Sequence, residues 1–133
     1  MRLEIKVLLL VYIAMIMVVF ILPFFSVENY SIVKNTTSQL GAQKTPNAWV
    51  MNVVFGLLGL SSIWAGWNYL QGYWFHKIIL LIFGTSLTMT AIFSHAPINE
   101  EIAYNIRTDK LHSLFATITG FAFSIFAIST GFI

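Results

Sequence analysis

Four long apolar runs limit what this chain can fold into. Each approaches the roughly 20 residues with which a helix crosses the hydrocarbon core of a bilayer. The runs are continuous rather than alternating, which favours helices over the strands of a membrane barrel. The predicted helices cover about 7–25, 46–70, 75–94 and 111–131. We therefore predict an all-α fold, an integral membrane bundle of four transmembrane helices in a single domain over residues 1–133.

The composition agrees with a membrane environment and excludes several other classes. Hydrophobic residues make up 58% of the chain and charged residues only 9%, whereas soluble domains use roughly 45–50% and 25%. The seven basic residues form no stripe that could follow a phosphate backbone, so nucleic acid is not an expected partner. The chain has no cysteine, which excludes disulfides and thiolate chemistry. The lipid bilayer is the predicted partner.

Small residues recur on one face of three of the predicted helices. Such faces let helix backbones approach closely in lipid, so we expect all three to lie inside one tightly packed bundle. The second helix carries Asn52, Gly56, Gly59, Ser62 and Gly66. The third leads through Gly84, Thr88 and Ala91 to His95. The fourth repeats small residues at steps of four and three: Ser113, Thr117, Gly120, Ser124, Ala127 and Gly131.

Short connections make successive helices antiparallel, which predicts the sides on which the loops lie. The loops 26–44 and 95–110 should share one membrane face, with both termini and His76 on the other. His76 is expected to be an interfacial anchor beside Lys77. Basic residues are nearly balanced between the two faces, so the positive-inside rule does not choose the orientation.

The stretch from His95 to His112 concentrates the polar chemistry of the chain. Asp109 and His112 are one helical turn apart on one face, and His95 ends the preceding helix. Two imidazoles, a carboxylate and an open position would suit a zinc ion that activates a water. His95, Asp109 and His112 are thus candidate metal ligands, and Ser38, Asp109 and His112 are candidate catalytic residues. Asn52 is a further polar candidate on the same side.

A structural interpretation of these residues is preferred to a catalytic one. Asp109 stands where the fourth helix needs an N-cap, and His112 and His95 would then be neutral residues at the membrane interface. A non-catalytic polar binding site is the next alternative, and a metal hydrolase the third. Thr45 followed by Pro46 likewise predicts an N-cap and first residue for the second helix.

Two motifs resemble a family of bacterial multi-pass membrane proteins catalogued as domain of unknown function 998. The first is the segment 30–52, with Ser38–Gly41 as its more specific part, and the second combines residues 95–98 with residues 109–116. Family members usually have two more helices, so the resemblance implies a short or a truncated member. In a truncated member the two helices that would complete the bundle are missing or are supplied by another subunit. It implies a location in the bacterial cell membrane and no established activity.

The sequence thus favours a structural or interaction bundle, or a subunit of a larger assembly. The expected partners are a second copy in a homo-oligomer or another membrane subunit. The alternative is a metal-dependent intramembrane hydrolase that acts on a lipid, with its polar site at His95, Asp109 and His112. Whether the protein is an enzyme is left open. A transporter is disfavoured because no charged residue lies within a predicted span apart from Lys77, at the start of the third.

Overall fold

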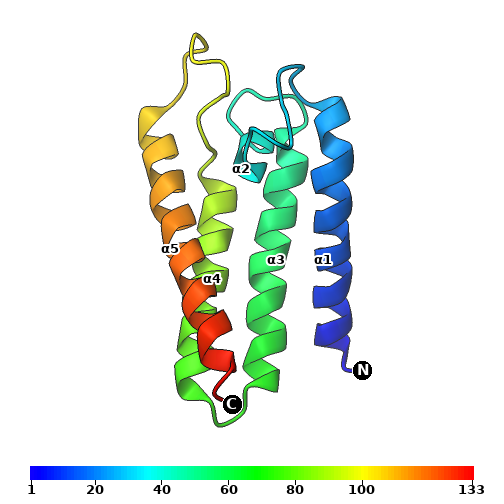
Figure 1. Ribbon diagram of the computed structural model, residues 1–133, viewed down its shortest axis with the longest axis vertical. Coiled ribbons are helices and arrows are strands. Elements are labelled where there is room, and N and C mark those ends of the chain that lie inside the picture. Colours follow the sequence, from blue (N-terminus) through cyan, green and yellow to red (C-terminus); the bar gives the residue numbers. More distant parts are fainter.

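The computed structural model describes all 133 residues as helices joined by loops (Figure 1). Four helices are long and apolar enough to cross a membrane, and there is no strand, which confirms the predicted all-α fold with four spans. The elements are α1 (Leu3–Ile21), a 3-10 turn η1 (Leu22–Phe25), α2 (Thr37–Leu40), α3 (Ala48–Tyr69), α4 (Trp74–Ile92) and α5 (Ile106–Thr130).

The long helices alternate in direction, as the short connections predict. Both termini lie at one end of the molecule together with the turn between α3 and α4, here called the terminal end (Figure 1). The segments 26–47 and 93–105 lie at the opposite end, here called the loop end. The predicted sides of the loops and termini are therefore confirmed.

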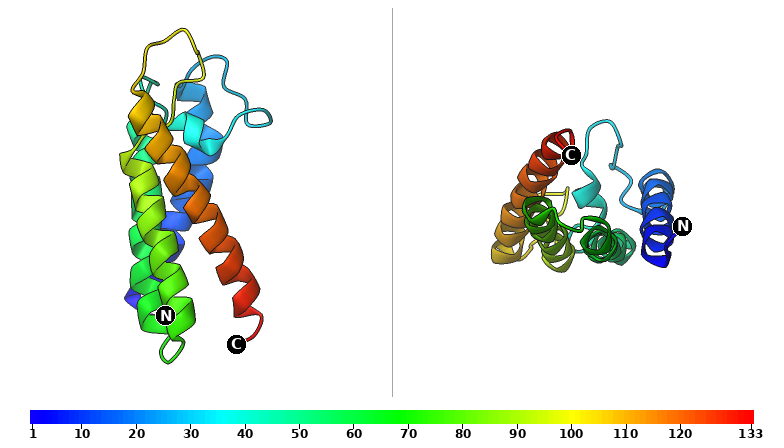
Figure 2. Two further views of the ribbon diagram at one scale, coloured as in Figure 1. Left: turned by 90° about the vertical axis from the view of Figure 1, so that its left-hand side faces the viewer. Right: turned by 90° about the horizontal axis from the view of Figure 1, so that it is seen from below.

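The four spans form an open row rather than a closed bundle. α4 packs between α3 and α5, and α1 packs on the other side of α3, whereas α1 and α5 share no packed interface. Seen along the helices, the row is curved, with α1 and α5 at its two ends (Figure 2). The terminal part of α5 also slants away from its neighbours. The two outer helices therefore turn most of their surface outward.

The small faces of α3 and α4 pack against each other as predicted. A Cβ atom added at Gly59 would lie 2.5 Å from the carbonyl oxygen of Gly84, and one added at Gly84 would lie 2.6 Å from that of Gly59. Real side chains do not approach backbone so closely. These two glycines therefore set the short separation of the two helices.

The small face of α5, here called the α5 seam, does not lie inside the bundle, and this prediction is wrong. All six of its residues are exposed, and a Cβ at Gly120 would meet no atom within 4 Å. α5 turns His112 and Ala122 toward the protein instead. The repeat of small residues identifies a face suited to close packing, but it does not identify the helix that packs there.

The loop end is filled by the chain's own segment 26–47, which packs into the curve of the row. The two largest side chains that are fully buried, Leu40 of α2 and Met51 of α3, belong to the core cluster there. Tyr30 packs against the same cluster and its hydroxyl donates to the carbonyl of Thr36. Burial raises the pKa of Tyr30, so the phenol stays a donor at neutral pH.

Two predicted helix starts are wrong. Asn47, in the left-handed conformation at φ 58°, precedes α3, and its side chain donates to the carbonyl of Phe25 at 2.7 Å. Thr45 and Pro46 lie in the preceding turn. α5 begins at Ile106, because the side chain of Asn105 already accepts from the N–H of Thr108 at 3.0 Å.

Candidate functional site

The polar residues at the loop end converge where α4 ends and α5 begins. His95 follows α4, Asp109 and His112 lie in the first turns of α5, and Asn52 reaches over from α3. We call these four residues, together with Gln43, the loop-end site. Their hydrogen bonds determine what the site can do.

His112 is the buried member of the site, with 2% of its surface exposed. Its Nδ1 lies 2.6 Å from the carbonyl oxygen of Phe93 and 3.1 Å from that of Thr90. Carbonyl oxygens only accept, so Nδ1 carries the hydrogen and Nε2 does not in the neutral ring. The last carbonyls of a helix have no partner within the helix. His112 therefore caps the C-terminal end of α4 from the neighbouring helix.

His95 lies against His112, edge to face, with 5.3 Å between the ring centroids. Its Nδ1 is 2.7 Å from the carbonyl oxygen of Ala96, which by the same reasoning fixes the hydrogen on Nδ1. The Nε2 of His112 is buried and has no hydrogen-bond partner. Both rings thus hold Nδ1 against backbone and leave Nε2 as a lone-pair atom.

Asp109 stabilises the loop before its helix rather than capping the helix. Its Oδ1 accepts from the N–H of Ala96 at 2.7 Å. The predicted N-cap role is therefore wrong, because the helix has already started at Ile106 and the carboxylate faces the segment that follows α4. A charge-assisted bond of this kind holds His95, the neighbour of Ala96, close to α5.

Gln43 joins the two loops, and sequence reasoning missed it. Its N–H donates to the carbonyl of His95 at 2.8 Å, and its side chain donates to the carbonyls of Ser94 and Asn105, both at 3.1 Å. The side-chain oxygen also accepts from the N–H of Asn105 at 2.9 Å. A glutamine in a polar loop has no periodicity or spacing that would distinguish it.

Asn52 also joins separate segments of the chain through hydrogen bonds. Its side-chain nitrogen donates to the carbonyl of Gly41 at 3.0 Å and to the hydroxyl of Ser94 at 3.3 Å. A Cβ at Gly41 would lie 2.3 Å from the side-chain oxygen of Asn52, so a larger residue there would displace this amide. The amide therefore joins α3 to both loops.

The predicted metal-binding and catalytic roles depend on which of these side chains come together. Ser38 lies on α2 and makes no hydrogen bond to His95, Asp109 or His112. No three histidine, cysteine, aspartate or glutamate side chains lie close enough together to hold a metal ion. Two imidazoles held through Nδ1 by backbone carbonyls are nevertheless oriented as metal-binding histidines often are. Zinc, its three ligands and the catalytic roles of Ser38, Asp109 and His112 stay predictions.

At the terminal end, polar groups are enclosed by aromatic rings. The Nζ of Lys77 lies 4.7 Å from the ring centroid of Trp67 and 5.3 Å from that of Trp74. The ring of His76 meets Tyr73 edge to face at 5.9 Å. These rings form a belt of the kind found at membrane interfaces.

Comparison with known proteins gives one match. The family model described as protein of unknown function (DUF998) matches residues 10–132. No curated protein and no solved structure matches the chain. The family match covers both loops of the site and all four spans except the first residues of α1. This multi-pass membrane protein with four apolar helices therefore belongs to the DUF998 family, whose activity is unknown.

Proposed function

We propose that this protein is a non-enzymatic membrane subunit that associates through the α5 seam with a second copy of itself. The observation that carries this proposal is the exposure of all six seam residues in a helix that is long and apolar enough to cross a membrane. Within the chain, the same kind of face on α3 and α4 is used for close packing around Gly59 and Gly84. The α5 seam is the one that has no helix against it.

The proposal follows from the way in which helices gain packing energy in a bilayer. Lipid chains are as apolar as leucine, so helices associate through close van der Waals contact at small residues. A seam of small residues placed on its own copy by a two-fold axis makes a self-complementary interface. The open row of helices leaves this face of α5 accessible to a partner.

The hydrogen bonds of the loop-end site also support a structural role. Gln43, Asn52 and Asp109 each direct their hydrogen bonds to backbone or to Ser94, which ties the loops to α3 and α5. His112 uses Nδ1 to cap α4. Such a site stabilises the ends of the helices. On the resemblance to bacterial multi-pass proteins, we also propose the bacterial cell membrane as the location.

Gly120→Leu tests the proposal. We expect wild-type protein in a mild detergent to be a dimer or larger, and the leucine variant to shift to monomer at the same concentration, because the larger side chain holds the helices apart. Light scattering with size exclusion, corrected for detergent, measures the mass. A Cβ at this position meets no atom of its own chain within 4 Å and the site is exposed, so the fold should be kept, and unchanged helicity by circular dichroism checks this.

Gly120→Ala is the matched control and should stay oligomeric, because alanine is still small. A wild-type protein that is monomeric over the accessible concentration range would contradict the proposal. A leucine variant with the same mass as the wild-type oligomer would also contradict it.

A further inference from the structure

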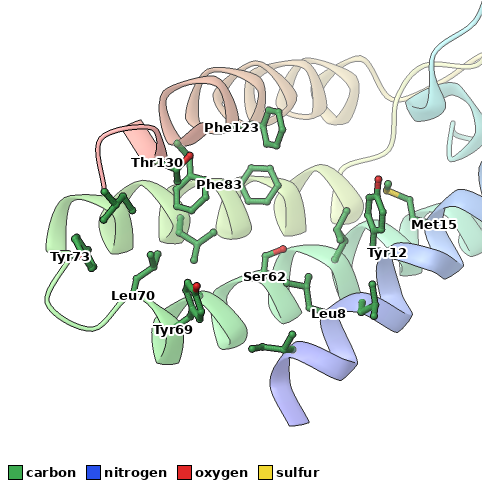
Figure 3. Close-up of a pocket in the computed structure, with 17 residues that line it drawn as sticks. Leu8, Tyr12, Met15, Ser62, Tyr69, Leu70, Tyr73, Phe83, Phe123 and Thr130 are labelled. Carbon is green, nitrogen blue, oxygen red and sulfur yellow. The ribbon is translucent and has the colours of Figure 1, made fainter. Parts of the chain in front are cut away.

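A groove lies between the two outer helices in the terminal half of the molecule (Figure 3). It has a volume of about 1170 Å³ and is lined by 17 residues of α1, α3, α4 and α5 and the adjoining turns, 14 of them hydrophobic. This exceeds the roughly 300–1,000 Å³ of typical small-molecule sites. The lining includes Leu8, Leu58, Phe83 and Phe123 and contains no charged side chain. A large apolar molecule fits such a surface.

The length of the groove limits what can occupy it. Along α3 the lining runs from Leu58 to Tyr69, which is roughly 16 Å at 1.5 Å per residue. That is about half of the 30 Å hydrocarbon core, or one leaflet. Beyond it, at the loop end, the core around Leu40 and Met51 fills the curve of the row. A transmembrane helix would need a groove across the whole bilayer, whereas a lipid of one leaflet does not.

Ser62 provides a polar group inside the groove. It is 9% exposed and lines the groove, and its hydroxyl points into it (Figure 3). The other buried hydroxyls of the spans donate to carbonyls of their own helix: Ser61, Ser86 and Thr90. Ser62 makes no such bond, and the carbonyl of Leu58, four residues before it, accepts from Ser61 instead. The oxygen of Ser62 is open to the groove rather than enclosed by protein, and a hydroxyl that faces lipid without a partner is costly, so an occupant that accepts a hydrogen bond would be stabilised there.

The remaining polar side chains of the lining are uncharged hydroxyl groups as well. Tyr12, Tyr69 and Tyr73 contribute phenol hydroxyls, and the hydroxyl of Thr130 donates to the carbonyl of Ala127 in its own helix. None of these groups would neutralise a phosphate, but the phenols can donate to an ester or hydroxyl oxygen. The groove therefore matches an uncharged amphiphile better than an anionic phospholipid.

We propose that the groove binds diacylglycerol. One ester carbonyl accepts from the hydroxyl of Ser62, and the acyl chains lie against the leucines and phenylalanines of α1, α3 and α5. The site is open sideways to the bilayer, because α1 and α5 share no packed interface. Loading therefore requires no passage through water.

Photolabelling of the purified full-length protein tests this. A diacylglycerol with a diazirine in one acyl chain is added in detergent and cross-linked by light, and the labelled peptides are mapped by mass spectrometry. We expect saturable labelling of groove residues such as Leu8 and Phe123. Ser62→Ala should weaken the apparent affinity about five- to tenfold, the value of roughly one hydrogen bond.

Ser61→Ala is the matched control. It removes a buried hydroxyl one residue away that donates to its own helix, so labelling should be unchanged. Leu8→Trp fills the groove from α1, the outer helix, and should abolish saturable labelling even if Ser62→Ala is poorly folded. Circular dichroism verifies the helicity of each variant.

Four outcomes would overturn the proposal. Two concern the labelling itself: labelling that does not saturate, or labelling that neither Ser62→Ala nor Leu8→Trp changes. The third is stronger competition by phosphatidylglycerol or an isoprenoid quinone than by unlabelled diacylglycerol, and the fourth is a groove cross-linked to a second copy of the chain. Saturable labelling that is lost in the two groove variants and kept in Ser61→Ala would support it.

Discussion

Gly84→Ala is expected to lower the free energy of unfolding by about 2 kcal/mol, because its Cβ would overlap the neighbouring helix. That Cβ would lie 2.6 Å from the carbonyl oxygen of Gly59 and 2.4 Å from Cγ1 of Ile63. Overpacking costs about 1–3 kcal/mol, and a backbone carbonyl cannot rotate away as a side chain can. The gain in helix propensity from alanine, about 1 kcal/mol, offsets only part of a loss at the upper end of this range.

Unfolding of the detergent-solubilised protein by heat or by a denaturing detergent measures the effect. Gly120→Ala is the matched control, since it is the same substitution within a spanning helix but its Cβ meets nothing within 4 Å. It should be as stable as wild type or slightly more stable. Equal stability of the two variants would mean that α3 and α4 are not packed as closely as described.

His112→Ala is expected to cost about 3 kcal/mol of stability. The variant loses the Nδ1 donor to the carbonyls of Phe93 and Thr90 and leaves a cavity at a position that is 2% exposed. The end of α4 would then have buried carbonyls without a donor. The same unfolding measurement applies, and amide hydrogen exchange should increase at the end of α4 before it increases elsewhere.

Two conservative variants separate the capping role from other roles of the ring. The side-chain nitrogen of asparagine occupies the place of Nδ1, so His112→Asn should keep much of the stability, whereas His112→Gln places its amide nearer to Nε2 and should not. Asparagine that is as damaging as alanine would contradict the capping role. If Nε2 binds zinc, added zinc should raise the melting temperature of wild type but not of His112→Asn.

The spans could be predicted from the sequence because the bilayer imposes a length and an apolar composition on each one. The ends of the helices were less predictable. Asn105 and Asp109 are both good N-cap residues, four positions apart, and hydropathy does not decide between them at a membrane surface. The structure uses Asn105 as the cap and directs Asp109 to Ala96. That choice depends on where the loop after α4 lies, which is a tertiary property.

The loop-end site was partly predictable for the same reason. His95, Asp109 and His112 stand out as rare polar residues near helix ends, and the structure does bring His95 against His112 and Asp109 against Ala96. The contribution of Gln43 depends on the backbone groups that it meets across some sixty residues of chain. No local pattern records such a contact.

The α5 seam shows a further limit of sequence reasoning. Its spacing is as regular as that of the α3 face, and both predict a surface for close packing. Which helix packs there depends on the order of the helices in the row, and the row is open. An inward position was therefore the wrong expectation, although the packing chemistry of the face is unchanged.

Disulfide cross-linking in native membranes tests the association through the α5 seam most directly. The chain has no cysteine, so a single cysteine introduced at Gly120 reports only on its own contacts. Small residues on a two-fold interface bring backbones close enough for a disulfide, which needs roughly 4.4–6.8 Å between Cα atoms. Ile125→Cys is the control, since Ile125 is 44% exposed on the same helix but lies off the seam. We predict that mild oxidation gives a covalent dimer with Gly120→Cys and not with Ile125→Cys; no dimer at Gly120, or equal dimer at both positions, would contradict the account.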